Sequence, residues 1–257
     1  MWNSLRTDAP AALIAGVTSY QGGDGDLIHA YVARPEGPGP YPGVVLAHHM
    51  PGWDELYREF ARRFADHGYT VITPDLYCRT GHGDPDDVAA AARAAGGAVD
   101  DVVVADLVAA RDWLRSLPTS NGKVGVFGTC SGGRHALLAA SKVGGFDAVA
   151  DLWGGGVVAS GDELTPERPV SVLDYTSGLD APLLGIFGDQ DQFPTPELVN
   201  RHEEELKKHG KEYEFHRYPD AGHGFFYYHR AAYRPESTMD GWAKVFEFFG
   251  RHLTPGS

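Results

Sequence analysis

The chain has 257 residues, of which 42% are hydrophobic, so a single α/β domain over residues 1–257 with a sizeable core is expected. Its formal net charge of −13 argues against nucleic acid or anionic membranes as partners, and no apolar run approaches the roughly 20 residues of a membrane span. Its two cysteines are too few for a disulfide framework or a structural zinc site, and the start of the sequence lacks a secretory pattern, so a cytoplasmic location is expected.

Short apolar segments and amphipathic segments alternate along the chain. The apolar segments predict strands over residues 27–32, 43–47, 70–73, 123–127, 148–153, 182–187 and 213–218. Helical periodicity predicts helices over about 54–67, 101–117, 132–141, 195–209 and 238–253. Residues 79–100 are rich in Gly, Ala and Asp, which indicates a loop-and-helix excursion that can cap a site. The alternation predicts an α/β fold, with a mostly parallel central sheet and helices on both faces.

Ligand sites in such sheets lie outside the carboxyl ends of the strands, so the residues after each strand carry the information. The strand ending at residue 127 is followed by G-T-C-S-G, which is the nucleophile elbow G-x-S-x-G of the α/β-hydrolase fold with Cys130 in place of serine. Small residues on both sides of the nucleophile avoid clashes in this strained turn, and the helix that begins there favours a thiolate. The alternative interpretation is that Cys130 is a small buried residue and the glycines only begin a helix.

A thiol nucleophile needs a base, and the base needs an orienting acid; on this fold the chain order is nucleophile, acid, histidine. Asp191 follows the strand over 182–187 and is the predicted acid, with Asp189 in the same turn as the alternative. His223 follows the last predicted strand, and glycines on both sides suit a tight loop that projects its ring into a cleft. The alternative for His223 is a loop histidine whose glycines serve only a turn.

Two backbone amides are predicted to form the oxyanion hole. The first belongs to Ser131, directly after the nucleophile, and the second to the loop after the strand over 43–47. In that loop Pro51 has no N–H, so Met50 is the predicted donor, through its amide only.

The chain resembles the dienelactone hydrolase family (carboxymethylenebutenolidases) from about residue 27 to 253. The resemblance rests on G-T-C-S-G-G at the elbow, P-D-L-Y-C-R at 74–79, F-G-D-Q-D at 187–191 and D-A-G-H-G-F at 220–225. It implies a triad of Cys130, His223 and Asp191, hydrolysis of enol-lactones or small esters, and no metal or organic cofactor.

The sequence departs from the family at two positions. Members have a glutamate that contacts the resting thiol, where this chain has His49, and two arginines that hold the substrate carboxylate. Arg79 matches the first arginine, whereas the second falls near Tyr227. Arg79 is thus a candidate substrate contact, with a structural ion pair as the alternative. His49, Trp53 and Tyr227 are candidates for lining the substrate pocket, with packing as their alternative.

Without a carboxylate that competes for the thiol proton, Cys130 is predicted to rest as a thiolate paired with His223. The predicted reaction is attack of the sulfur on a small ester or enol-lactone, followed by hydrolysis of a thioester. The chain is expected to be a monomer or a small homo-oligomer. Rival hypotheses are a flavodoxin-like cysteine amidase, a ligand-binding pseudo-hydrolase without turnover, and a redox switch between Cys78 and Cys130.

Overall fold

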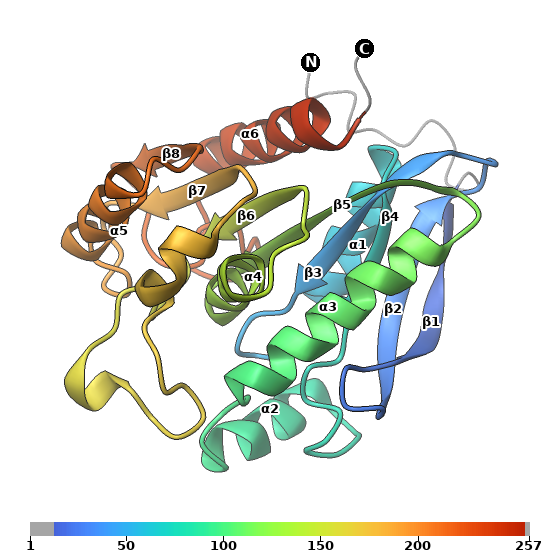
Figure 1. Cartoon of the computed structure of the whole chain (residues 1–257), viewed down its shortest axis with the longest axis horizontal. Helices are drawn as coiled ribbons and strands as arrows, with labels where there is room; N and C mark the ends of the chain where they lie inside the picture. Colours follow the sequence, from blue (N-terminus) through green and yellow to red (C-terminus); the bar gives the residue numbers. More distant parts are fainter. Residues whose placement is uncertain (1–12, 255–257) are drawn as a thin grey trace.

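A computed structural model describes residues 13–254 of the chain (Figure 1). Eight strands form one sheet in the order β1-β2-β4-β3-β5-β6-β7-β8. Their bounds are β1 (Leu13–Gln21), β2 (Leu27–Pro35), β3 (Tyr41–Ala47), β4 (Thr70–Pro74), β5 (Ser120–Thr129), β6 (Ala148–Leu152), β7 (Leu183–Gly188) and β8 (Tyr213–Tyr218). The strands from β4 to β8 in that order are parallel, whereas β1 and β2 run antiparallel to their neighbours, so the predicted mostly parallel sheet is confirmed.

The sequence pattern did not predict β1, because this edge strand has few buried residues and no clear apolar alternation. It pairs only with β2, over its whole length. An edge strand of this kind is stabilised by backbone hydrogen bonds more than by side-chain burial, which explains the missing signal.

Six helices connect and cover the strands: α1 (Glu55–Asp66), α2 (Pro85–Ala94), α3 (Asp100–Ser116), α4 (Ser131–Lys142), α5 (Pro196–Lys208) and α6 (Pro235–Leu253). The loop between β6 and β7 also holds two short 3-10 helices, η3 (Gly161–Glu163) and η4 (Val172–Gly178). Apolar side chains of α1 and α6 pack against one face of the sheet, and those of α3 and α4 against the other. Helices on both faces were expected from the alternating pattern.

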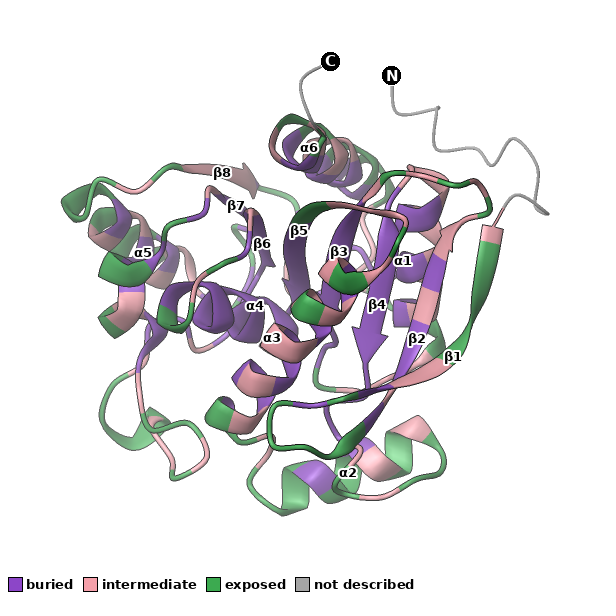
Figure 2. Cartoon of the chain, turned by 45° about the vertical axis from the view of Figure 1, so that its right-hand side comes forward, coloured by how far each residue is buried: buried purple, intermediate pink, exposed green. Residues whose placement is uncertain are grey.

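The central strands and the helix after the elbow form the most buried part of the molecule (Figure 2). Ten of the twelve residues of α4 are buried. The excursion over 79–100 contains α2, which covers the carboxyl-end edge of the sheet and buries only Ala89 and Ala92. The central part is therefore rigid by packing, whereas α2 is held by few contacts.

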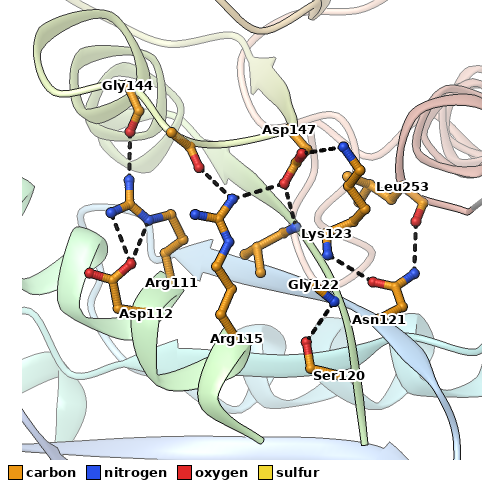
Figure 3. Close-up of polar contacts among 12 residues, drawn as sticks. Arg111, Asp112, Arg115, Ser120, Asn121, Gly122, Lys123, Gly144, Asp147 and Leu253 are labelled. Carbon is orange, nitrogen blue, oxygen red and sulfur yellow. Dashed lines mark hydrogen bonds and ion pairs between the residues drawn. The ribbon is translucent and has the colours of Figure 1, made fainter.

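Charged side chains fix the opposite end of β5, far along the strand from its carboxyl end (Figure 3). Asp147 accepts hydrogen bonds from the Val124 amide, from Lys123 and from Arg115. These bonds hold the pKa of Asp147 below its usual range, although burial acts in the opposite direction. This cluster ties the start of β5 to the segment that enters β6, so the elbow at the other end of β5 rests on a well-anchored strand.

Candidate active site

Cys130 lies in the sharp turn between β5 and α4, as the elbow motif predicts. Its backbone has φ 55° and ψ −127°, in a region that residues other than glycine rarely adopt. Its amide donates to the Leu152 carbonyl at 3.0 Å, which fixes the turn to β6. The strained turn presents the thiol at the N-terminus of α4, where the helix dipole favours negative charge on sulfur.

Close backbone approaches explain the glycines of the elbow. A Cβ atom on Gly128 would lie 2.1 Å from the Gly132 carbonyl oxygen, and one on Gly132 would lie 2.0 Å from the Ala47 carbonyl oxygen. Neither neighbour is a flexible side-chain end that could move away. The motif therefore reflects the tight packing of the β5–α4 turn against the end of β3.

His223 and Asp191 meet beside Cys130, although they are 32 residues apart in the chain. The Nδ1 atom of His223 lies 2.9 Å from Oδ2 of Asp191, whose side chain is 2% exposed. The other carboxylate oxygen of Asp191 accepts a hydrogen bond from the Phe193 amide at 2.8 Å. Asp189, the alternative acid, is exposed. The structure thus brings Asp191 to the histidine, in the loop after β7 as expected.

The imidazole of His223 favours its protonated form. Burial lowers its pKa, but hydrogen bonds with Asp191 and with Cys130 outweigh burial and raise the pKa to about 10. A histidine held as imidazolium beside a thiol stabilises the thiolate form of that thiol. The geometry is therefore suited to nucleophilic attack by sulfur at neutral pH.

The amides of Ser131 and Met50 both lie beside Cys130. Both residues line the cavity that contains Cys130, and among the described residues no group accepts a hydrogen bond from either amide. Two free N–H donors next to a nucleophile can hold the oxyanion of a tetrahedral intermediate. An oxyanion hole formed by these two amides stays a prediction.

A cavity of about 360 Å³, here named the catalytic cavity, joins these groups. It is lined by Met50, Cys130, Ser131, Gly155, Arg168, Gln190, Asp191, Gln192, Phe193 and His223. Its size suits a small organic substrate.

The structure places Arg79 outside the catalytic cavity. Its guanidinium donates to both carboxylate oxygens of Asp106, at 2.7 and 3.1 Å, and to Asp26 at 2.6 Å. The guanidinium of Arg79 is therefore already bound to two carboxylates of the protein. The structural ion pair, and not a contact with a substrate carboxylate, describes its role in this geometry.

His49, Trp53 and Tyr227 also lie outside the catalytic cavity. The Nε2 atom of His49 is 2.7 Å from Oδ2 of Asp54, and the His49 ring packs against Tyr227. Trp53 lines a separate cavity near α2. None of the three lines the catalytic cavity, and a role for them in a substrate pocket stays a prediction.

Tyr227 supports the elbow from behind. Its hydroxyl lies 2.6 Å from Oγ1 of Thr129, and the hydroxyl of Tyr57 lies 2.9 Å from the same atom. The Thr129 amide also donates to the Tyr57 hydroxyl at 3.0 Å. Two buried tyrosine hydroxyls thus fix the residue that precedes Cys130.

Sequence reasoning missed three charged residues near the site. Arg168, from the loop between β6 and β7, lines the catalytic cavity, and Arg93 of α2 lines an adjoining one. Asp151 is fully buried on β6, and desolvation raises its pKa to about 7 although the Gly154 amide donates to it. Only the three-dimensional path of the loops brings the two arginines to the site, and no local motif marks them.

Three further observations concern the redox switch, a metal site and a membrane span. Cys78 and Cys130 are free thiols. Among residues 13–254, no cluster of three or more His, Cys, Asp or Glu side chains could hold a metal ion. Within the same range, no helix is long and apolar enough to cross a membrane.

Known proteins are similar to this chain in sequence and in fold. The dienelactone hydrolase family matches residues 28–253. A protein of Escherichia coli strain K12 named "Putative carboxymethylenebutenolidase" is 34% identical over 246 residues, which cover 94% of this chain and 88% of that protein. A Bradyrhizobium protein named "Probable 2-oxo-3-(5-oxofuran-2-ylidene)propanoate lactonase" is 27% identical over 233 residues, or 90% of this chain and 92% of that one.

A solved structure is similar over nearly the whole chain. It is the "Putative Dienelactone Hydrolase" of Klebsiella pneumoniae subsp. pneumoniae MGH 78578, with a TM-score of 0.84 and 31% sequence identity. The superposition covers 94% of this chain and 100% of that one. The fold is accordingly the α/β-hydrolase fold, and the flavodoxin-like alternative is wrong.

Proposed function

Because the chain belongs to the dienelactone hydrolase family, we propose that it hydrolyses small esters or enol-lactones with the thiol of Cys130 as nucleophile. The single observation that carries this proposal is the convergence of Cys130, His223 and Asp191 in one cavity. A pseudo-hydrolase that only binds its ligand would not need all three groups in this order. Reaction class follows from these side chains, since the fold alone would not identify it.

In the first half of the proposed reaction, the Cys130 sulfur attacks the substrate carbonyl carbon while His223 holds the thiol proton. Asp191 keeps the imidazole in the orientation that presents Nε2 to the sulfur and to the leaving group. The amides of Ser131 and Met50 bind the carbonyl oxygen as it becomes negative. The C–O bond then breaks, the leaving oxygen takes the proton from His223, and an acyl thioester remains on Cys130.

In the second half, water attacks the thioester carbonyl. His223 takes a proton from that water, the C–S bond breaks, and the carboxylic acid product leaves the regenerated thiolate. For a lactone, the alcohol or enol released in the first half stays attached to the acyl group. An enolate leaves readily, so an enol-lactone needs less help from the acid than an alkyl ester does.

The names of relatives support lactones as one substrate class. The Bradyrhizobium relative is named as a lactonase and the Escherichia coli relative as a carboxymethylenebutenolidase. The catalytic cavity, of about 360 Å³, has room for a small lactone ring. Hydrolysis of a butenolide ring is therefore the reaction we expect first.

The test is hydrolysis of p-nitrophenyl acetate and of a dienelactone by the wild type and by Cys130→Ala. We expect the variant to lose activity by about 10³-fold or more on any substrate that the wild type turns over. Cys78→Ala is the matched control, because Cys78 is the other free cysteine and lies outside the catalytic cavity. Equal rates for Cys130→Ala and wild type would reject Cys130 as nucleophile, and binding without turnover would favour the pseudo-hydrolase.

A further inference from the structure

A second cavity, separate from the catalytic one, is bordered by residues of α1, α2, β1 and β2. This α2 cavity has a volume of about 220 Å³, and the lining residues that matter here are Val17, His29, Arg58, Asp75, His82 and Val88. Neither the proposed triad nor the two residues of the predicted oxyanion hole line it. Its volume is below the roughly 300 Å³ of a site for a drug-sized ligand, so it suits a smaller molecule.

Asp75 presents a carboxylate oxygen without a partner to this cavity. The residue follows β4 and is only 9% exposed. Its Oδ1 atom accepts a hydrogen bond from the Tyr77 amide at 3.1 Å, and its own amide donates to the His29 carbonyl at 2.8 Å. Within the described part of the chain, Oδ2 accepts no hydrogen bond. Because polar atoms on such buried side chains are normally hydrogen-bonded, Oδ2 is a ready acceptor for a ligand.

Arg58 of α1 supplies the opposite charge. The central carbon of its guanidinium lies 4.6 Å from the centre of the Trp53 ring, a cation–π contact that orients the group. Among residues 13–254, no acid lies within ion-pair distance of Arg58. Its guanidinium is therefore free to bind a carboxylate from outside the chain.

Asp75 and Arg58 are near each other but do not touch. Burial raises the pKa of Asp75, whereas the Tyr77 amide and nearby positive charges, Arg58 among them, lower it. The charge of Arg58 thus acts on Asp75, although the described side chains form no ion pair between them. A ligand that carries its own pair of opposite charges can bind both side chains at once.

The remaining lining residues suit the two ends and the body of such a ligand. His29 and His82 pack edge to face, with 5.4 Å between their ring centres. Nδ1 of His29 lies 2.9 Å from Oγ of Ser19, and its Nε2 atom has no hydrogen-bond partner among the described residues. A neutral imidazole nitrogen can donate or accept, so it can serve either charged end. Val17 and Val88 add apolar surface to the cavity.

These charges favour a zwitterion over a simple ion. A ligand with only negative charge would be repelled by Asp75, and one with only positive charge would be repelled by Arg58. An α-amino acid carries both charges on one carbon atom. We propose that the α2 cavity binds a free amino acid with an apolar side chain, with its ammonium group on Asp75 and its carboxylate on Arg58. The apolar side chain then packs against Val17 and Val88.

The test is isothermal titration calorimetry of the full chain at pH 7 with three probes that share one side chain. L-leucine should bind with a Kd of about 1 mM or lower. Leucinamide lacks the carboxylate, and 4-methylpentanoate lacks the ammonium group. Each analogue should bind at least about tenfold more weakly than leucine, because each loses one charge-assisted contact.

Two variants locate the binding to this cavity. Asp75→Asn keeps an oxygen for the Tyr77 amide, and Arg58→Gln removes a guanidinium that has no ion pair. Each should weaken leucine binding by about tenfold or more. Asp87→Asn and Arg201→Gln are matched controls, because both residues are exposed and line neither cavity, and their Kd should stay within about twofold of wild type. Circular dichroism checks the fold, and Arg58→Gln decides alone if Asp75→Asn does not fold.

Three outcomes would overturn the amino-acid site. They are no saturable binding of leucine up to about 10 mM, an analogue that binds as tightly as leucine, and wild-type affinity in both Asp75→Asn and Arg58→Gln. The site does not depend on the proposed hydrolysis, since binding is measured without turnover. Cys130→Ala should therefore bind leucine as the wild type does.

Discussion

The strand ends below Cys130 and the segments above it build the catalytic cavity and the cavity next to it in different ways. Below, Cys130, Asp191 and the Met50 amide sit directly after β5, β7 and β3, where the parallel sheet fixes their spacing. Above, Arg93 and Arg168 come from α2 and from the long loop between β6 and β7, and both are exposed. The strand ends supply groups whose positions must be precise, whereas the loops supply charge that only has to converge.

This difference indicates how such an enzyme can change substrate without changing its chemistry. Preorganised groups next to the reacting atoms depend on a rigid scaffold, and loops tolerate substitution. Changes at the strand ends should therefore reduce turnover of every substrate or alter stability. In the loops, a change to a residue that lines a cavity should alter the ratio of the rates on different substrates. A change to a residue that only anchors the loop should alter stability alone.

The largest expected effect follows from Asp191, the proposed acid of the triad. Asp191→Asn keeps the shape of the side chain, but its amide N–H can donate to Nδ1 and so stabilise the wrong tautomer of His223. The value of kcat should therefore fall by about 10²–10⁴-fold. Asp189→Asn changes the same charge two residues away on an exposed side chain, and its kcat should stay within about twofold of wild type. Steady-state kinetics on one good substrate measure both. Similar losses of kcat in the two variants would mean that the geometry of the turn controls the rate, and not the hydrogen bond between His223 and the Asp191 carboxylate.

The second prediction concerns the resting charge of the thiol. The pKa of His223 is raised to about 10 by Asp191 and Cys130 against burial, so the imidazolium persists through neutral pH and loses its proton only in strong base. Alkylation of Cys130 by iodoacetamide should then already be fast at pH 6, because the neighbouring imidazolium favours the thiolate. Burial raises the pKa of Cys78 to about 11, so Cys78 should stay unlabelled there.

Mass spectrometry of the labelled peptides separates the two cysteines. His223→Gln should remove the fast reaction of Cys130 at pH 6, because the cation that stabilises the thiolate is gone. A wild-type rate that rose only near pH 8.5 would contradict the thiolate–imidazolium pair.

The third prediction concerns Asp151, the buried acid on β6. Desolvation raises the pKa of Asp151 to about 7, whereas in the unfolded chain it is ~3.9, so the protein loses stability as pH rises from about 4 through 7. Asp151→Asn keeps an acceptor for the Gly154 amide and should raise the free energy of unfolding at pH 8 by about 2–4 kcal/mol. The gain should vanish near pH 4, where both forms are neutral.

Asp147→Asn is the contrasting control for Asp151. Its hydrogen bonds keep the pKa of Asp147 low, so this carboxylate stabilises the fold above the unfolded pKa and loses that effect as pH falls (Figure 3). Its replacement should therefore destabilise the protein at pH 8 and matter less at pH 4. Denaturant unfolding of the wild type and of both variants at both pH values measures the six free energies. Changes of the same sign for both variants at pH 8 would contradict the assignment.

The sequence identified the strand ends better than the loops, for physical reasons. Cys130, Asp191 and His223 follow strands in a fixed order, and the elbow glycines record backbone contacts that no larger residue allows. The role of Arg79 stayed open between a substrate contact and an ion pair, because its partner Asp106 lies 27 residues away on α3, where no local pattern reveals it. Arg168 was missed because its position depends on the path of the β6–β7 loop.

The fourth prediction contrasts Arg79 with Arg168. Arg79→Met would leave the Asp106 carboxylate, which is 1% exposed, without its guanidinium. The free energy of unfolding should fall by about 1–3 kcal/mol, the low side of a broken buried pair, because Arg79 itself is partly in water. Substrate ratios should not change. Arg168→Gln should show the reverse: stability should not change because Arg168 is exposed, and kcat/KM should change because Arg168 lines the catalytic cavity. A change of kcat/KM in Arg79→Met would contradict this contrast.

The smallest effect is expected behind the elbow. Tyr227→Phe removes the hydroxyl that lies 2.6 Å from Oγ1 of Thr129, while the Thr129 side chain keeps Tyr57 as a partner. One lost buried hydrogen bond with the partner still satisfied should cost about 1 kcal/mol. The control Tyr228→Phe removes the hydroxyl of an exposed ring, which donates to Glu59, and the free energy of unfolding should hardly change. Because Thr129 precedes Cys130, kcat should fall a few-fold with Tyr227→Phe alone; an unchanged kcat would mean that the elbow keeps its geometry without this hydroxyl.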